Sequence, residues 1–161
     1  MTLFEEIYTE NYSVMSRVAA KLLGDQEVGS DVVQDIFIDL FQHLENDCQI
    51  LNLKGWLYRA IYNRCIDNLR RQKRFKMIQI NAVVEESEDI LEQEERKTII
   101  QNTLSKMKPR EKSLLVFYSE GLSYREISDV TGIRLTSVGK MLSRALKNFE
   151  HELKRQGYEL H

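Results

Sequence analysis

The chain has 161 residues, with 23 Lys and Arg against 25 Asp and Glu, so its formal net charge is −2. This length allows one domain or two small ones and excludes a large catalytic architecture. Hydrophobic residues make up 42% and charged residues 30% of the chain, which is the balance of a globular protein and excludes a disordered one. Seven Gly and one Pro are too few turn residues for an all-β chain, so an all-α fold is expected.

Several functional classes are excluded by what the sequence lacks. The longest apolar run, residues 114–118, is far shorter than the roughly 20 residues that span a bilayer. The first residues lack the pattern of a signal peptide, so we expect a cytoplasmic protein without direct membrane insertion. Cys48 and Cys65 have no CxxC spacing and the three His are far apart, so no disulfide or metal site is expected. Without a phosphate loop, HExxH or G-x-S-x-G motif, we expect no enzyme and no cofactor.

Charge is sorted into blocks along the chain, which the net value conceals. Residues 25–47 hold seven acids and no Lys or Arg, whereas residues 54–76 hold eight bases and one acid. Residues 75–103 are acidic again, and residues 104–161 hold eleven bases and seven acids. Separated basic segments of this kind are typical of proteins that bind nucleic acids.

Helical periodicity in the first half predicts three long helices. Apolar residues recur at helical spacing in residues 3–22, and Gly24 is suited to the cap that follows. Residues 26–44 carry a nearly unbroken apolar stripe, and residues 53–74 place Leu or another apolar residue at every fourth position. These segments predict a small three-helix bundle.

The second half predicts another helical domain after a linker. Residues 75–89 are acidic and lack helical periodicity, which is typical of a flexible linker. The predicted helices that follow are about 90–106, 109–119, 123–130 and about 136–155. Ser123 and Glu126 have the spacing of a capping box and Gly132 permits a tight turn, so the last two helices have helix-turn-helix spacing.

The third helix carries a cationic row opposite its apolar side. Arginine forks pair with phosphate oxygens and Asn can read a base edge, so the row suits a nucleic-acid backbone. Aromatic rings lie along the same helix, as an unstacked single strand requires, although Trp56 could equally belong to the core. A solvated basic face is the alternative. The candidate DNA-binding residues here are Trp56, Arg59, Asn63, Arg70, Arg71 and Arg74.

The second helix carries a row of acids spaced one turn apart, Asp31, Asp35 and Asp39, with Gln34 beside the row. Like charges at this spacing destabilise a helix by roughly 0.2 to 0.5 kcal/mol per pair, so stability alone does not explain them. The row suits a basic protein partner. The alternatives are that the acids keep the bundle soluble or pair with the basic third helix.

The last helix has a buried stripe and a polar face, which is typical of a recognition helix in the major groove. Any helical hairpin with Gly in its turn can imitate this pattern. The candidate DNA-binding residues of this half are Arg125, Arg134, Ser137, Lys140, Arg144 and Lys147.

Four segments in this order resemble the extracytoplasmic-function group of sigma-70-type sigma factors. They are DVVQDIFIDLF (31–41), LKGWLYRAIYNRCIDNLRR (53–71), LSKMKPREKSLLVFYSEGLSYREISDVTG (104–132) and SVGKMLSRALKNF (137–149). The resemblance implies a sigma-2 domain at 1–74, a linker at 75–99 and a sigma-4 domain at 100–161. It implies a non-enzymatic transcription initiation factor that binds core RNA polymerase and promoter DNA. It also implies that an anti-sigma factor restrains this activity.

The resemblance also implies roles for the candidate residues. Gln34 and Asp35 match the helix that binds the β′ clamp helices, and the β flap is the second expected polymerase contact. Residues of the third helix match the segment that melts and reads the minus-ten element: Trp56, Arg59, Asn63 and Arg70. Residues of the last helix match the one that enters the minus-35 element: Ser137, Lys140 and Arg144.

The recognition helix departs from the family pattern at Gly139 and Met141, and at Arg134-Leu135-Thr136 where the helix begins. Gly inside a helix costs about 1 kcal/mol relative to Ala. These departures leave open a sigma-like subunit that needs a second chain. A separate alternative is a stand-alone helix-turn-helix regulator that binds duplex DNA by itself, with the first domain as an oligomerisation or sensor module.

Overall fold

The structure is a computed structural model that describes residues 1–78 and 92–157, with the side chains of 75–78 and 92–94 left out. The described residues form helices and connecting turns, without a strand. The first three helices are α1 (Leu3–Leu23), α2 (Gln26–Glu45) and α3 (Leu53–Ile78). The others are α4 (Glu92–Ser105), α5 (Pro109–Ser119), α6 (Tyr124–Thr131) and α7 (Leu135–Arg155). The predicted all-α class is confirmed.

The helix ends follow from local capping residues. Thr2 and Ser123 each make a capping box with the Glu three residues on, at the starts of α1 and α6. Gly24 and Gly132 end these two helices in the left-handed region, with φ of 72° and 78°. Pro109 lies at the start of α5, where its missing N–H leaves no bond unmade.

The predicted linker is helical at both ends. Helix α3 continues to Ile78, beyond the predicted end at residue 74, and α4 begins at Glu92. The segment between them, 79–91, lies outside the described residues, and so does that part of the linker prediction.

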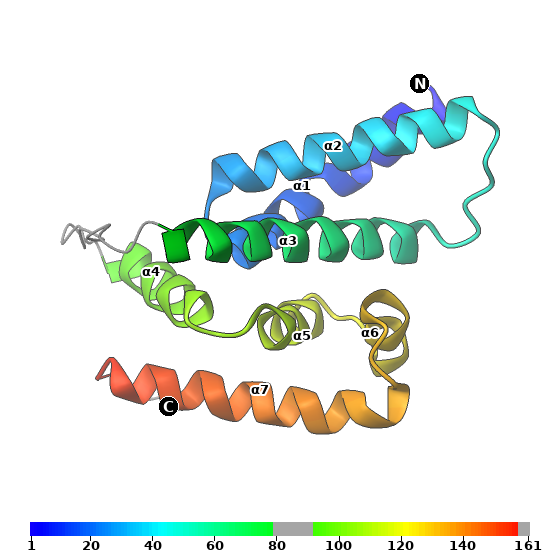
Figure 1. Cartoon of the computed structure of the whole chain (residues 1–161). Helices are drawn as coiled ribbons and strands as arrows, with labels where there is room; N and C mark the ends of the chain where they lie inside the picture. The colour runs from blue at the N-terminus through cyan, green and yellow to red at the C-terminus, as the bar shows by residue number, and fades with distance from the viewer. Residues whose placement is uncertain (79–91, 158–161) are drawn as a thin grey trace.

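The two helical sets pack against each other. Helices α1, α2 and α3 form the upper layers in Figure 1, and α4, α5 and α6 lie between α3 and α7. One cluster of buried apolar side chains runs through both sets, from α1, α2 and α3 into α5, α6 and α7. Phe117 of α5 is fully buried, with its ring centroid 5.6 Å from that of Tyr58 and 6.1 Å from that of Tyr62. The sequence predicted two domains but not this shared core.

Candidate nucleic-acid and protein interface

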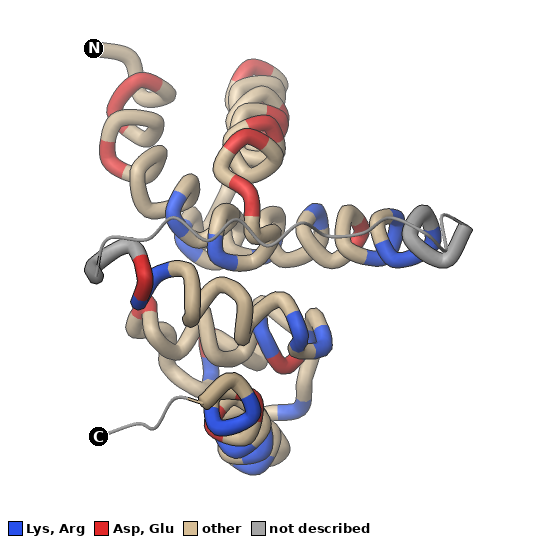
Figure 2. The backbone as a smooth tube through the Cα atoms, turned by 90° about the vertical axis from the view of Figure 1, so that its left-hand side faces the viewer, with Lys and Arg blue, Asp and Glu red and all other residues tan. Residues whose placement is uncertain are grey.

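The acidic row lies on the outer side of α2, opposite the apolar stripe that faces the core. Asp25 starts this helix by accepting hydrogen bonds from the N–H groups of Glu27 and Val28. Asp31, Gln34 and Asp35 are exposed, and Asp39 is half-buried. Figure 2 shows red acidic segments along α2.

Two of these acids have a partner in the same bundle. Arg64 of α3 pairs with Asp39 and lies 3.8 Å from a carboxylate oxygen of Asp35. Intramolecular neutralisation, one of the alternatives from the sequence, therefore holds for this part of the row. Asp31 and Gln34 make no side-chain hydrogen bond or ion pair with the described residues, so the outer end of the row is available to a partner.

An exposed isoleucine lies within the same face. Ile38 is 55% exposed, one helical turn from Gln34 and Asp35. Sequence reasoning missed it because it falls outside the apolar stripe of α2. An apolar side chain on the polar face is itself a signal of a contact surface when acids surround it.

The predicted row on α3 is on the solvent side. Arg59, Asn63, Arg70, Arg71 and Arg74 are all exposed, opposite the buried Leu57, Ile61 and Cys65. Burial raises the pKa of the Cys65 thiol to about 12. The cationic half of α3 extends beyond the other helices in Figure 2, where its basic residues are in view.

The sequence left open whether Trp56 is a core residue or an exposed aromatic ring, and in the structure it is partly both. It is half-buried and packs against the core, and its indole makes an edge contact with His43 at 5.3 Å between ring centroids. Tyr58, by contrast, is buried, and burial raises its pKa to about 12. Trp56 is thus held firmly by α2 while part of the ring remains open to solvent.

The helix-turn-helix is formed by α6 and α7. Lys140, Arg144 and Lys147 are exposed on α7, and Ser137 is half-buried. Arg125 and Arg134 are exposed at the starts of α6 and α7. The opposite side of α7 is buried through Val138, Leu142, Ala145 and Leu153. The predicted division of α7 into an apolar and a cationic face is therefore present in the fold.

The two departures in α7 have packing explanations. Met141 is half-buried and packs against the core. Gly139 lies beside the ring of Tyr124. Both residues belong to the packing of the domain.

Polar contacts join the two helical sets on the same side as the candidate DNA-binding residues. Arg59 donates from Nη2 to the carbonyl oxygen of Asp129 in α6, at 2.8 Å. Lys54 pairs with Glu126 at 2.9 Å. The hydrogen bond from the backbone N–H of Ser123 and the Lys54 ammonium lower the pKa of Glu126.

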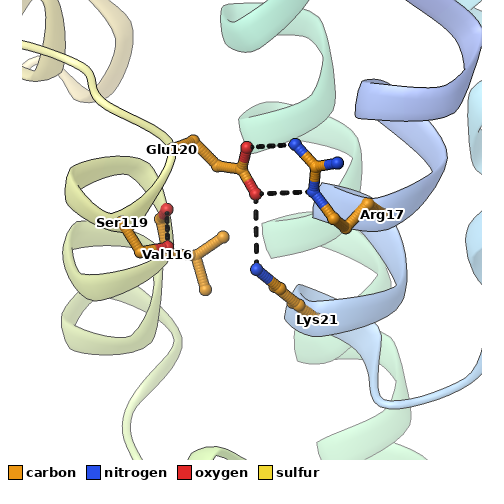
Figure 3. Close-up of polar contacts among 5 residues, drawn as sticks. All are labelled: Arg17, Lys21, Val116, Ser119 and Glu120. Atoms are coloured by element: carbon orange, nitrogen blue, oxygen red, sulfur yellow. Dashed lines mark hydrogen bonds and ion pairs between the residues drawn. The ribbon is translucent and has the colours of Figure 1, made fainter.

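A second group of contacts lies between α1 and α5 (Figure 3). The Glu120 carboxylate accepts hydrogen bonds from Arg17 Nε at 3.0 Å and Arg17 Nη2 at 2.6 Å, and Lys21 Nζ lies at 3.3 Å. The hydrogen bonds from Arg17 lower the pKa of Glu120 and raise that of Arg17. The side chain of Glu120 is only 7% exposed, so this pair is shielded more than a surface ion pair.

No cluster of His, Cys, Asp or Glu among the described residues is arranged to hold a metal ion. In the same part of the chain, no helix combines the length and apolar character that a membrane crossing requires.

Two family models match the chain, each on one helical set. Sigma-70 region 2 matches residues 7–75, and Sigma-70, region 4 matches residues 97–149. The first covers most of α1, all of α2 and most of α3, and the second covers α6 and most of α7.

Two bacterial sigma factors are similar in sequence. The ECF RNA polymerase sigma factor SigE of Mycolicibacterium smegmatis is 26% identical over 99% of this chain, which spans 65% of the length of that relative. The RNA polymerase sigma factor SigV of Bacillus subtilis is 24% identical over 92% of this chain and 89% of its own.

Two solved structures share the fold. One is the sigma factor RpoE of Bartonella quintana in complex with the anti-sigma factor NepR, with a TM-score of 0.73, 18% identity and coverage of 94% of this chain and 96% of the other. The other is CnrH in complex with the cytosolic domain of CnrY, with a TM-score of 0.67, 19% identity and coverage of 94% and 88%.

Proposed function

The chain belongs to the sigma-70 family of RNA polymerase sigma factors, and we propose that it binds core RNA polymerase, directs it to promoters and helps to melt them, without catalysing a reaction itself. The observation that carries this proposal is the exposed cationic row of α3, within the segment that matches region 2. In the proposed division of the chain, residues 1–74 act at the minus-ten element and residues 100–161 at the minus-35 element, joined by 75–99.

The residues of α3 have chemistry suited to DNA opening. Strand separation requires unstacked bases to be held, and a cationic track with an aromatic neighbour does this for a single strand. Arg59, Arg70, Arg71 and Arg74 would hold phosphates, while Asn63 and the exposed part of Trp56 lie where a base could be read. The arrangement of these side chains along one helix favours a role in holding a separated DNA strand.

Helix α7 would read the upstream element. Its exposed Lys140, Arg144 and Lys147 suit phosphates and guanine edges in the major groove, with Ser137 at the edge of the same face. Arg125 and Arg134 lie at helix starts, where side chains reach the DNA backbone. Two modest binding sites become one strong site when the polymerase fixes their separation.

The polymerase contact is assigned to α2. Asp31, Gln34, Asp35 and Asp39 would meet a basic surface on the β′ clamp helices, with complementary charge setting the orientation. Asp31 and Gln34 make no side-chain hydrogen bond or ion pair with the residues that the structure describes, and they suit this role best. The β flap is the second proposed contact.

Control by an anti-sigma factor is proposed from the structural neighbour RpoE, a sigma factor in complex with the anti-sigma factor NepR. The other neighbour, CnrH, is also in complex with a protein partner, the cytosolic domain of CnrY. A cytoplasmic location follows from the same function, since polymerase and promoter are both there.

Reconstituted transcription tests the proposal. Run-off transcription on genomic fragments with purified core polymerase should yield discrete products only when the chain is added. Substituting Arg70→Ala with Asn63→Ala should abolish them and leave core binding intact, whereas Lys154→Ala, an exposed basic residue at the end of α7, should leave them unchanged. Full activity of the double variant would remove the role assigned to α3.

Two further measurements test the remaining assignments. Asp31→Lys and Asp35→Lys should weaken core association, and Glu10→Lys on α1 is the matched control. A gel shift without polymerase should show little specific binding. Clear, salt-sensitive specific binding by the chain alone would instead indicate a stand-alone regulator.

A further inference from the structure

The single tryptophan of the chain lies where the end of α2 meets the start of α3. Trp56 is in the first turn of α3, and these two helix ends lie at the same end of the first helical set in Figure 1. The carbonyl oxygen of Asn52 accepts a hydrogen bond from the Trp56 N–H at 2.9 Å. Asn52 Oδ1 accepts another from the N–H of Gly55 at 3.0 Å, as a residue that caps a helix does. The backbone of Trp56 is thus fixed by its own helix start.

The turn that ends α2 fixes the backbone of His43 on the other side of this junction. The N–H of Cys48 donates to the carbonyl oxygen of His43 at 3.0 Å. The next bond inward, at 3.3 Å, runs from the N–H of Asp47 to the carbonyl oxygen of Leu44. These two bonds form a Schellman motif, and Asp47 has the left-handed φ of 54° that the motif requires. Glycine is the usual residue at that position because a Cβ disfavours the conformation.

The imidazole ring of His43 also has a fixed direction. Its Nδ1 lies 2.8 Å from the backbone carbonyl oxygen of Asp39, one turn earlier. Because a carbonyl oxygen only accepts, Nδ1 carries the hydrogen, and Nε2 has the free lone pair of the neutral ring. The Asp39 carboxylate in turn pairs with Arg64, which ties this turn of α2 to α3.

This fixed ring meets the indole of Trp56 at a steep angle. The two ring centroids are 5.3 Å apart, with 68° between the ring planes. Aromatic pairs prefer such a geometry, and it stabilises them beyond the area that they bury. His43 is exposed and Trp56 is half-buried, so the contact lies at the surface and restrains the indole outside the core.

We propose that His43 is a positioning residue, which holds the indole of Trp56 in the orientation that stacks on an unpaired base. The proposal rests on the proposed function, in which Trp56 belongs to the segment that melts DNA. An aromatic ring that is already oriented loses less conformational freedom when a base stacks on it. His43 acts in this role through Trp56 and not by contact with DNA.

Charged side chains near the pair do not engage the imidazole. They are Asp39 and Glu45 on α2, and Lys54 and Arg59 on α3. Among the residues that the structure describes, no charged side chain makes a hydrogen bond or ion pair with His43. Between about pH 5 and pH 8, histidine is the side chain whose charge ordinarily changes. A proton taken up by Nε2 therefore places a positive charge beside the indole.

Fluorescence of Trp56 tests the contact, because it is the only tryptophan and an adjacent imidazolium quenches indole emission. Emission of the wild type should fall as the pH is lowered from about 8 to about 5. His43→Ala and His43→Phe should both abolish this change. His151→Ala, which removes an exposed histidine from α7, is the matched control and should leave it intact. Acrylamide should quench the indole more strongly in His43→Ala than in the wild type or in His43→Phe, which keeps a ring beside it.

Promoter opening with core polymerase tests what the contact does. The yield of permanganate-reactive thymines should fall about two- to tenfold in His43→Ala, as expected for the loss of one aromatic pair. His43→Phe should restore the yield, because it replaces the ring although it lacks the hydrogen bond to Asp39. Core association and the free energy of unfolding should be unchanged in both variants and in His151→Ala, since these histidines are exposed.

Three results would overturn the role of His43. These are wild-type emission that does not change with pH, promoter opening by His43→Ala equal to that of the wild type, and weaker core association of His43→Ala. The last result would make His43 a polymerase contact. A wild type that opens no DNA removes the proposed function, and this role with it. The two failures are distinguishable, because only the second one appears in the wild type on promoter DNA.

Discussion

The ring of Tyr124 lies against the backbone of Gly139. A Cβ built on Gly139 would come within 3.2 Å of Tyr124 Cε2, closer than ordinary van der Waals contact. Tyr124 is the first residue of α6 and Gly139 is in the second turn of α7, so this contact sets the two helices of the helix-turn-helix against each other. The glycine that interrupts the family pattern therefore serves packing between helices.

Substitution of this glycine should depend on size. In Gly139→Ala the Tyr124 ring, 44% exposed, can move by a few tenths of an ångström. The change should therefore stabilise the chain by up to about 1 kcal/mol through helix propensity. Gly139→Leu must displace the ring and should destabilise by about 1–3 kcal/mol. Urea unfolding measures both, and destabilisation of more than 1 kcal/mol in the alanine variant would show that the ring cannot yield.

The ion pair between Arg17 and Glu120 should weaken in acid. Hydrogen bonds from Arg17 lower the pKa of Glu120 below its ordinary value of 4.5, so the folded chain favours the carboxylate. The stabilisation is complete above that ordinary value and is lost as the pH falls through the lowered pKa. The free energy of unfolding should therefore hold this contribution from about pH 6 to pH 9 and lose it below about pH 4. Glu120→Gln should remove this acid transition, and an unchanged transition would assign it to other carboxyl groups.

Removal of the buried ammonium should destabilise the packed chain. Lys112→Met keeps the apolar stem and leaves the Leu22 carbonyl without this donor. The loss should be about 1–3 kcal/mol in the free energy of unfolding. Lys108→Met, an exposed lysine just before α5, is the control and should change it by less than about 0.5 kcal/mol. Equal stability of the two variants would mean that the Lys112 contact is not formed in solution.

The two cysteines should differ sharply toward a thiol reagent. Cys48 is exposed, whereas Cys65 is buried and its pKa is raised to about 12 by burial. Since the thiolate is the reactive form, one thiol should react in the native chain near pH 8 and the second only after denaturant is added. Cys48→Ser should abolish the native reaction. Rapid reaction of both thiols would indicate that the α3 core opens readily.

Local features of the sequence predicted most of the helices. The Ser123 capping box, Pro109 at a helix start and Gly132 after a helix all have the predicted roles. The outer face of α3 was also predictable, because its apolar residues recur every fourth position and fix the opposite side. These signals act over one or two turns and need no knowledge of tertiary structure.

Contacts between distant segments were not predictable in the same way. Nothing near Glu120 in the sequence indicates that its partner is Arg17, 103 residues away. Arg64 likewise resembled the other basic residues of α3 until the fold placed it beside Asp39. The helical end of the predicted linker was missed because the apolar period of α3 fades beyond Leu69 while the helix continues to Ile78.

Strand opening at a promoter tests the central claim most directly. Permanganate modification of unpaired thymines, on a promoter found by run-off transcription, reports melted DNA. We expect reactive thymines around the minus-ten element only when core polymerase and the chain are both present, and none with the Asn63→Ala and Arg70→Ala double variant. Thymines that react equally with core polymerase alone, or with the double variant, would contradict the role of this chain in opening DNA.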